Sequence, residues 1–366
     1  MNAKRDSNIE LLRIVSILLV LCSHCISHSN ENSGLLLNPD YNITLNHIFC
    51  VLIGTWGRLA VEIFVFISAY YMVDKEGGFR SKKVVKIGLQ TWFYCIVIMC
   101  FVYGFHLRKV SITDIEKEIL TPAYPQYWFI TNYILFYLLM PFLQIFVNKL
   151  KHSQLKCLVF ILTCIIGCFR MTEGVSNLVY FGYIFLIAAL LKRSNGWFER
   201  KSKLILPVAF ILSICLKIAI YDFDLLTGNG LTAVTLSGLQ MLSGFVTTIM
   251  AAALFYIFKC LNGRYFETGA IKRLSQATLG VYIIHENLLF RGSKGEPALI
   301  WDSIFHVGDT FYTSNMFCLR VVLAVVIVYG ACVLIENIRI EIIDKKVIEN
   351  IGWLDRICKR IDEYFQ

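Results

Sequence analysis

Charged residues and prolines are scarce in this chain. Of its 366 residues only 17% are Asp, Glu, Lys or Arg, and only six are proline. Soluble domains carry about 25% charged residues, so a composition this poor in charge excludes an ordinary soluble protein. Most of the remainder is apolar, because 57% of the residues are hydrophobic and 14% are aromatic. The composition indicates an integral membrane protein.

Signatures of several other classes are also missing. We find no Gly-rich nucleotide-binding loop, no internal repeat and no low-complexity tract. The first apolar run contains Glu10 and Arg13, and no small-residue cleavage site follows Cys22, so we expect a retained helix rather than a secretory signal. The 13 cysteines lie mostly inside expected helices, where a thiol behaves as a small apolar group. We therefore expect no disulfide framework.

Apolar runs recur along most of the chain, without a polar break large enough to fold by itself. A helix needs about 20 apolar residues to cross the roughly 30 Å hydrocarbon core. We predict an all-α integral membrane domain over residues 1–336 and a tail over residues 337–366. About ten transmembrane helices are expected, at residues 9–28, 57–74, 86–105, 127–147, 155–170, 175–191, 204–221, 235–258, 274–290 and 316–336.

The net charge of +9 follows the expected topology. Lys and Arg concentrate in alternate loops, which is typical of cytoplasmic loops. This pattern predicts that both termini are cytoplasmic, and it accounts for the positive charge without a nucleic-acid partner. The tail has apolar residues at helical spacing with cations between them, which favours an amphipathic helix on the inner leaflet of the membrane.

Three ionisable residues fall in the first span. Such groups cost several kcal/mol in a membrane unless they face protein or water, so each is a candidate for function. Arg13 and His24 are eleven residues apart, which places them on one helix face about 16 Å from each other. Glu10 lies on the same stripe, one turn before Arg13. A purely structural reading, with Glu10 paired to Arg13 and His24 bonded to a carbonyl, stays open for each residue.

Two further spans carry ionisable groups. In the second span Arg58 and Glu62 stand four residues apart, so they can pair with each other. Glu62 is also expected at the depth of His24, where a carboxylate would raise the basicity of the imidazole. In the ninth span His285 and Glu286 are neighbours that point to different sides of an ideal helix. We expect His285 to face the interior and Glu286 to approach the outer interface.

The cysteines beside His24 form a C-x-x-C pattern. A zinc site usually needs four ligands, and Cys22 and Cys25 supply two thiols with no second pair at suitable spacing. A redox motif of this kind would need a soluble strand-to-helix setting. We therefore predict that both cysteines are packing groups and that the protein has no metal site.

The stretch "NIELLRIVSILLVLCSHC" resembles the leading signature of the acyltransferase 3 family of membrane proteins, an Arg and a His separated by ten residues. Three later stretches are similar to further motifs of that family: "GRLAVEIFVFISAYYM", "YWFITNYILFYLLMPFL" and "LGVYIIHENLL". They cover nearly the whole chain in the expected order. Ala69 departs from the glycine usual in the second motif. The family's Arg-rich patch at the third helix is here a lysine-rich stretch, "FRSKKVVKIG".

The resemblance implies an integral membrane O-acyltransferase in its stand-alone form. Such an enzyme moves an acyl group, commonly acetyl, from cytoplasmic acyl-CoA to a hydroxyl of a carbohydrate. The implied donor-binding residues are Glu10, Arg13, Lys82, Lys83 and Lys86. Of these, Arg13 with Lys82, Lys83 or Lys86 would contact the phosphates of acetyl-CoA. The acceptor implied is a surface or capsular polysaccharide, or its lipid-linked precursor, at the inner (plasma) membrane of the cell.

His24 is the implied catalytic residue. It would act as general base on the acceptor hydroxyl or as a transient acyl carrier, with Glu62 or His285 as its orienting partner. The alternative from another class is a secondary transporter of a small anion or amino acid, which also uses buried Arg, His and Glu. Transporters of that kind favour inverted repeats and helices broken at paired Gly or Pro residues; this chain has only six prolines and no visible repeat.

Overall fold

The computed structural model describes residues 6–33, 44–74, 81–121, 125–168, 177–223, 231, 233–261, 269–292, 297–307, 315–345 and 351–364. Within these residues every regular element is a helix and no strand is present. The predicted all-α fold class is confirmed.

Seven described segments are long and apolar enough to cross a membrane. They comprise α1 (Ser7–Ser33), α2 (Leu45–Thr55) continued by α3 (Gly57–Met72), α4 (Ser81–Gly104), α6 (Trp128–Lys149), α10 (Trp197–Tyr221), α12 (Ala233–Lys259) and α16 (Phe317–Arg339). Two shorter apolar helices, α7 (His152–Cys168) and α9 (Asn177–Lys192), fall at the fifth and sixth expected spans. The protein is thus a multi-pass membrane protein, whereas a total of ten spans stays a prediction.

The ninth expected span differs from a single helix. It is divided into α13 (Gly269–Gln276), α14 (Thr278–His285) and α15 (Leu288–Arg291). The remaining elements are α5 (Ile112–Ile119), η1 (Pro125–Tyr127), η3 (Leu299–Ile304), η4 (Ile340–Asp344) and α17 (Gly352–Tyr364). The sequence analysis does not anticipate α2 or α5, because it assigns their residues to connecting segments.

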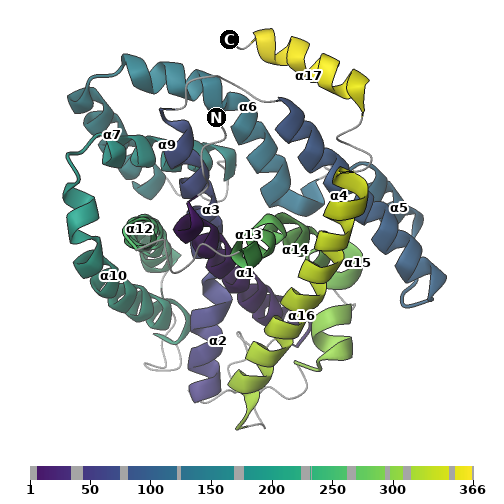
Figure 1. Ribbon diagram of the computed structural model, residues 1–366. Coiled ribbons are helices and arrows are strands. Elements are labelled where there is room, and N and C mark those ends of the chain that lie inside the picture. Colours follow the sequence, from purple (N-terminus) through teal and green to yellow (C-terminus); the bar gives the residue numbers. More distant parts are fainter. Residues whose placement is uncertain are drawn as a thin grey trace.

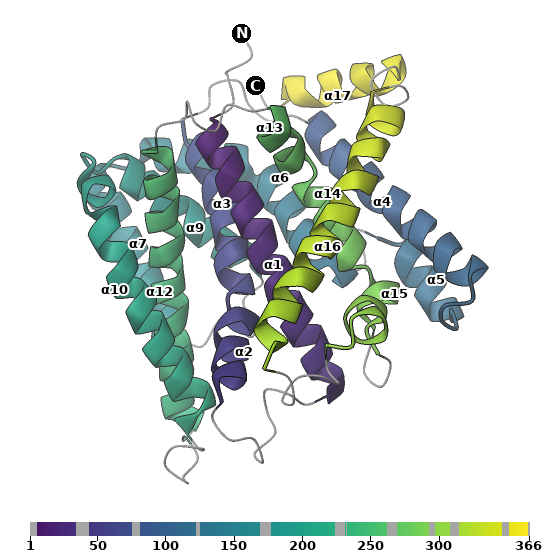
Figure 2. The same cartoon turned by 60° about the horizontal axis from the view of Figure 1, so that its bottom comes forward.

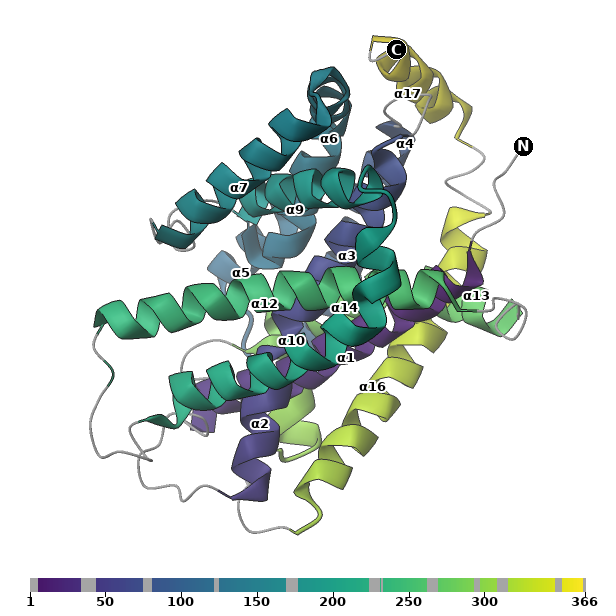
Figure 3. The same ribbon diagram turned by 90° about the vertical axis from the view of Figure 1, so that its left-hand side faces the viewer.

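Helix α1 lies in the middle of the bundle (Figure 1). It contacts α2, α3, α12, α13, α14 and α16. Helices α7, α10 and α12 lie on one side of α1, and α4, α5 and α16 lie on the other (Figure 2). Figure 3 shows α6, α7 and α9 together on the side of the molecule opposite α16. The central place of α1 explains why it can carry several polar groups, since protein rather than lipid surrounds them.

A close approach fixes α1 against the junction of α2 and α3. The Ser23 hydroxyl donates to the carbonyl oxygen of Gly54 over 2.6 Å. Gly57 faces the same serine, and a Cβ atom there would lie 2.6 Å from the Ser23 Oγ. Only glycine allows α3 to begin this close to α1. The contact brings the first turns of α3 beside His24.

A buried polar cluster joins α4, α14 and α16. The Glu336 carboxylate accepts hydrogen bonds from Nε and Nη2 of Arg339, each over 2.9 Å. It also accepts one from the Tyr94 hydroxyl over 2.5 Å. The side-chain amide of Gln90 donates to the same carboxylate over 2.9 Å. Gly280 of α14 packs directly on this carboxylate. Each charge is compensated by an opposite charge or a hydrogen bond, as burial requires.

The C-terminal helix α17 crosses the end of the bundle near the start of α4 (Figure 2). Its buried residues Leu354 and Cys358 pack there, and the backbone N–H of Ser81 donates to Asp362 over 2.7 Å. Trp353 and Ile357 of the same helix are exposed. The tail therefore contains a helix with two apolar faces, one on the protein and one free for lipid. Its place on the inner leaflet stays a prediction.

Candidate active site

His24 meets the end of α14 near the middle of the molecule. Its Nδ1 atom lies 2.9 Å from Nε2 of His285 and 2.8 Å from a carboxylate oxygen of Glu286. His28, one turn further along α1, contacts the same Glu286 oxygen through Nε2 over 2.9 Å. Arg291 donates to the other carboxylate oxygen over 2.8 Å. The group formed by His24, His28, His285 and Glu286 is called the histidine cluster below.

The hydrogen bonds of the cluster fix the tautomer of His24. Nδ1 of His285 lies 2.6 Å from the carbonyl oxygen of Val281, which can only accept, so this nitrogen carries the hydrogen. Nε2 of a neutral His285 is then an acceptor, and Nδ1 of His24 must donate to it. A neutral His24 consequently has its lone pair on Nε2, which makes no hydrogen bond to any residue that the structure describes. This is the tautomer that a general base needs.

The expectation that only His285 of the neighbouring pair faces the interior is wrong. Both His285 and Glu286 are buried, and both contact Nδ1 of His24. Helix α14 ends at His285, and Glu286 is its C-cap residue, with φ −92° and ψ 2°. The 100° rotation between neighbours of an ideal helix therefore does not separate their side chains. Glu286, like His28 and Tyr282, is a site residue that the sequence analysis does not select.

A second network anchors the chain just after Glu286. The side-chain amide of Asn287 donates to Glu118 of α5 over 3.0 Å and to the Tyr127 hydroxyl over 2.9 Å. Glu118 is almost fully buried, and this burial raises the pKa of its carboxyl above the ordinary value, while hydrogen bonds from Gln126 and Asn287 partly offset the shift. The network holds Asn287, and with it the neighbouring carboxylate of Glu286, in one position.

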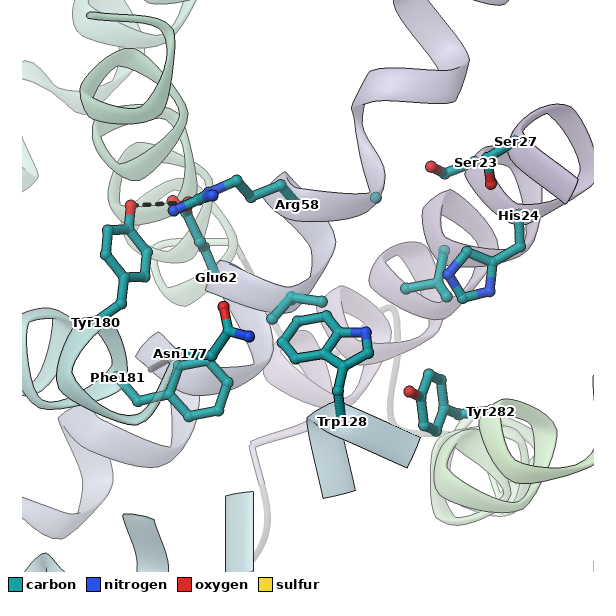
Figure 4. Close-up of a pocket in the computed structure, with 13 residues that line it drawn as sticks. Ser23, His24, Ser27, Arg58, Glu62, Trp128, Asn177, Tyr180, Phe181 and Tyr282 are labelled. Atoms are coloured by element: carbon teal, nitrogen blue, oxygen red, sulfur yellow. Dashed lines mark hydrogen bonds and ion pairs between the residues drawn. The ribbon is translucent and has the colours of Figure 1, made fainter. Parts of the chain in front are cut away.

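His24 faces a cavity of about 330 Å³, called the His24 cavity below. Figure 4 shows its imidazole on one side, Trp128 and Tyr282 below it, and Arg58, Glu62 and Tyr180 on the far side. Polar and aromatic groups alternate around it, since Ser23, Ser27 and Asn177 also line the wall beside Phe181. Such a lining can hydrogen-bond hydroxyl groups and can stack against the C–H face of a ring.

Glu62 shares the cavity with His24 but serves other partners. Its carboxylate lies 3.2 Å from Nε of Arg58 and accepts the Tyr180 hydroxyl over 2.9 Å. The Arg58 guanidinium also sits over the Tyr180 ring, 4.5 Å from its centroid. From the sequence, Glu62 could pair with Arg58 or serve as the partner of His24. In the structure it pairs with Arg58. Glu286, not Glu62, is the carboxylate beside His24.

Arg13 lines a second cavity of about 320 Å³, called the Arg13 cavity below. Of the three candidate lysines, Lys83 lines it, with its ammonium 3.0 Å from the Tyr133 hydroxyl and 4.4 Å from the centroid of the Tyr137 ring. Lys82 instead forms an ion pair with Asp355 of α17 over 2.5 Å. Lys86 is not among the residues that line the cavity.

Glu10 stands behind the Arg13 cavity rather than in its lining. It lies 3.5 Å from Arg13 and accepts a hydrogen bond from the Ser275 hydroxyl. The pairing of Glu10 with Arg13 matches the structural reading of these two residues. It leaves Arg13 at the cavity wall with its guanidinium held from one side.

The two cavities adjoin. Val20, Val61 and Tyr282 line both of them, so these three side chains form the boundary. The path along α1 leads from Arg13, past Val20, to His24. Arg13 and Lys83 thus line the cavity at one end of this path. His24, with the lone pair on its Nε2, lies at the other end.

The histidine cluster also has the composition of a metal site. His24, His285 and Glu286 each offer one ligand atom, and these atoms lie within 4.8 Å of one another. The hydrogen bonds described above account for their spacing without an ion, and Arg291 already neutralises the carboxylate. The absence of a metal stays a prediction. Cys25 is fully buried and Cys22 partly buried, both as free thiols, so neither offers a disulfide.

These features define a class, that of polytopic membrane proteins in which a partly buried histidine lines one of two adjoining cavities. A family model for the acyltransferase domain, that of the acyltransferase 3 family, matches residues 6–336. The chain belongs to the acyltransferase 3 family, as its motifs suggested, and it is a membrane acyltransferase. No curated protein and no solved structure matches the chain.

Proposed function

We propose that this protein is an acyl-CoA-dependent O-acyltransferase of the plasma membrane that transfers an acetyl or similar acyl group to a hydroxyl of a carbohydrate. The acceptor is a surface or capsular polysaccharide or its lipid-linked precursor. One observation carries the proposal: the base-competent His24 lines a polar, aromatic cavity that adjoins a cation-lined cavity.

The Arg13 cavity suits the donor. Arg13 and Lys83 can bind phosphate groups through charge-assisted contacts, and Lys82 and Lys86 stand in the same first turns of α4. The rise from Arg13 to His24 is about 16 Å, which is comparable to the extended pantetheine arm of CoA. A thioester held along this path reaches His24 with its acyl end.

The His24 cavity suits the acceptor. Asn177, Arg58 and Glu62 offer hydrogen-bonding groups for sugar hydroxyls, and Trp128 offers an aromatic face. His24 would remove the proton from the acceptor hydroxyl through Nε2. The imidazolium that forms would lie 2.8 Å from the Glu286 carboxylate, which stabilises it. His285 orients the ring, so general base catalysis explains the cluster more fully than an acyl-carrier role does.

The test replaces His24 and leaves its flanking cysteines as the control. The chain, His24→Ala and the double variant Cys22→Ala/Cys25→Ala are expressed in cells that lack their own O-acetylation, and polysaccharide acyl signals are measured by NMR. We expect the wild type and the cysteine variant to transfer and His24→Ala to lose at least about 100-fold in rate, the low end of a general base's contribution.

Two results would contradict the proposal. One is near-normal transfer by a correctly inserted His24→Ala variant. The other is a wild-type protein that neither transfers an acyl group nor binds acetyl-CoA more tightly than Arg13→Ala does. The second measurement also separates an acyltransferase from a transporter, because an anion carrier has no need to bind CoA.

A further inference from the structure

Tyr282 occupies a special position in α14. It lines both the His24 cavity and the Arg13 cavity, and only 6% of its surface is exposed. Its hydroxyl makes no hydrogen bond to any residue that the structure describes, although a buried hydroxyl normally finds a partner. Figure 4 shows this hydroxyl on the side of the ring that faces Trp128, which also lines the His24 cavity. An unused donor at such a place points to a group that arrives with the substrate.

The surroundings hold the Tyr282 ring in place. The ring packs edge-on against Phe129, with centroids 5.5 Å apart, and against Tyr127, at 6.3 Å. The His24 ring lies 6.4 Å away. The backbone N–H of Phe129, in the first turn of α6, approaches the Tyr282 oxygen without the geometry of a hydrogen bond.

The path of the donor leads past this hydroxyl. A thioester that enters through the Arg13 cavity must cross the boundary at Val20, Val61 and Tyr282 to reach the acceptor. Of the three boundary residues, Tyr282 alone has a side chain that can donate a hydrogen bond. A thioester on this path would bring its carbonyl carbon near both a base, His24, and a donor, Tyr282.

We propose that Tyr282 is a catalytic residue whose hydroxyl donates a hydrogen bond to the oxyanion formed during acyl transfer. The proposal rests on the function proposed above. Nε2 of His24 takes the proton of the acceptor hydroxyl, whose oxygen forms a bond to the carbonyl carbon. The carbonyl π electrons move to oxygen, where Tyr282 stabilises the charge. Collapse re-forms the carbonyl, breaks the C–S bond and releases CoA thiolate, which takes the proton from His24 to give an ester and free CoA.

The test removes the hydroxyl and keeps the ring. Tyr282→Phe retains the packing against Phe129 and Tyr127, so insertion and thermal stability should not change. We expect kcat to fall by about 100- to 1000-fold, as is usual for the loss of one oxyanion donor. The KM for the acyl-CoA donor should stay within about threefold of the wild-type value, because the interaction strengthens only in the transition state.

Tyr329→Phe is the matched control. Tyr329 of α16 also has a buried hydroxyl with no hydrogen-bond partner in the described part of the chain, but it lines neither cavity. Its variant should transfer at the wild-type rate. If Tyr282 had only a packing role, Tyr282→Phe would also transfer at the wild-type rate.

The outcomes separate this inference from the proposed function. If the wild type transfers acyl groups and Tyr282→Phe keeps kcat within about threefold, the oxyanion role is overturned while the acyltransferase function stands. A rise in donor KM at unchanged kcat would also overturn it, because it would make Tyr282 a donor-binding residue. If the wild type itself transfers nothing from acyl-CoA, the proposed function fails first.

Discussion

Glu286 and Glu62 are the two carboxylates that could support His24, and their contacts distinguish them. Glu286 contacts Nδ1 of His24 at 2.8 Å, and Nε2 of His28 at 2.9 Å. Glu62 lines the same cavity but binds Arg58 and Tyr180. A carboxylate stabilises an imidazolium strongly only when it is close and shielded from water. Glu286 meets both conditions and should support the base, whereas Glu62 should contact the acceptor.

Removing either charge with an isosteric amide gives different kinetics. We expect Glu286→Gln to lower kcat on the order of 100-fold with the acceptor KM little changed, because the imidazolium loses its counter-charge. Glu62→Gln should mainly raise the acceptor KM. Steady-state transfer rates at varied acceptor concentration measure both. The reverse pattern, with the larger loss of kcat at Glu62, would show that the carboxylate across the cavity serves His24.

At the scale of elements, the contact between α14 and α16 supports the site from behind. A Cβ atom at Gly280 would lie 2.4 Å from the carboxylate of Glu336. This carboxylate cannot move aside easily, since Arg339, Tyr94 and Gln90 all hold it. Gly280 lies two residues before Tyr282, so a shift of α14 there would also displace the boundary of the two cavities.

Gly280→Ala should therefore destabilise the protein by about 1–3 kcal/mol, the usual cost of overpacking. It should also reduce transfer, because α14 carries both Tyr282 and His285. Thermal unfolding in detergent measures the first effect. Gly330→Ala in α16 is the control, since a Cβ atom there meets nothing within 4 Å and alanine favours a helix. Equal unfolding midpoints for the two variants would mean that α14 has room to move.

The sequence predicts these elements well where one physical rule decides. Apolar length identifies most of the long spans, and helical periodicity places Arg13 and His24 on one path. The rules fail where the tertiary fold decides. An ideal helix turns Glu286 away from His285, but α14 ends at His285 and both side chains reach His24. Lys82 and Lys83 look alike in sequence, and only the position of α17 gives Asp355 to the first of them.

At the scale of the whole molecule, the Arg13 end of the path lies toward one end of the bundle. Helix α1 begins, and α17 lies, at the same end (Figure 2). Arg13 and Lys83 belong to the first turns of α1 and α4 at that end. An enzyme that draws on cytoplasmic acyl-CoA must turn this end to the cytoplasm. If the donor enters through the Arg13 cavity, the C-terminus must therefore be cytoplasmic. One experiment tests the direction of donor entry and the location of the terminus together.

Sealed vesicles of either orientation provide that experiment. A protease-cleavable tag after Gln366 should be cut only in inside-out vesicles, and acetyl-CoA added outside should support transfer only in the same vesicles. Because acyl-CoA is charged and does not cross a bilayer, the side of addition identifies the side of entry. A tag inserted between residues 226 and 227, which connect the expected spans at 204–221 and 235–258, is the matched control. With both termini cytoplasmic and the spans as predicted, this connection is external, so the tag should be cut in right-side-out vesicles alone. Transfer supported from the side opposite the C-terminal tag would contradict entry through the Arg13 cavity. Arg13 lies near the start of α1, at the end of the bundle where α17 lies. A donor from the opposite side would have to meet His24 before any of the cations proposed to bind it.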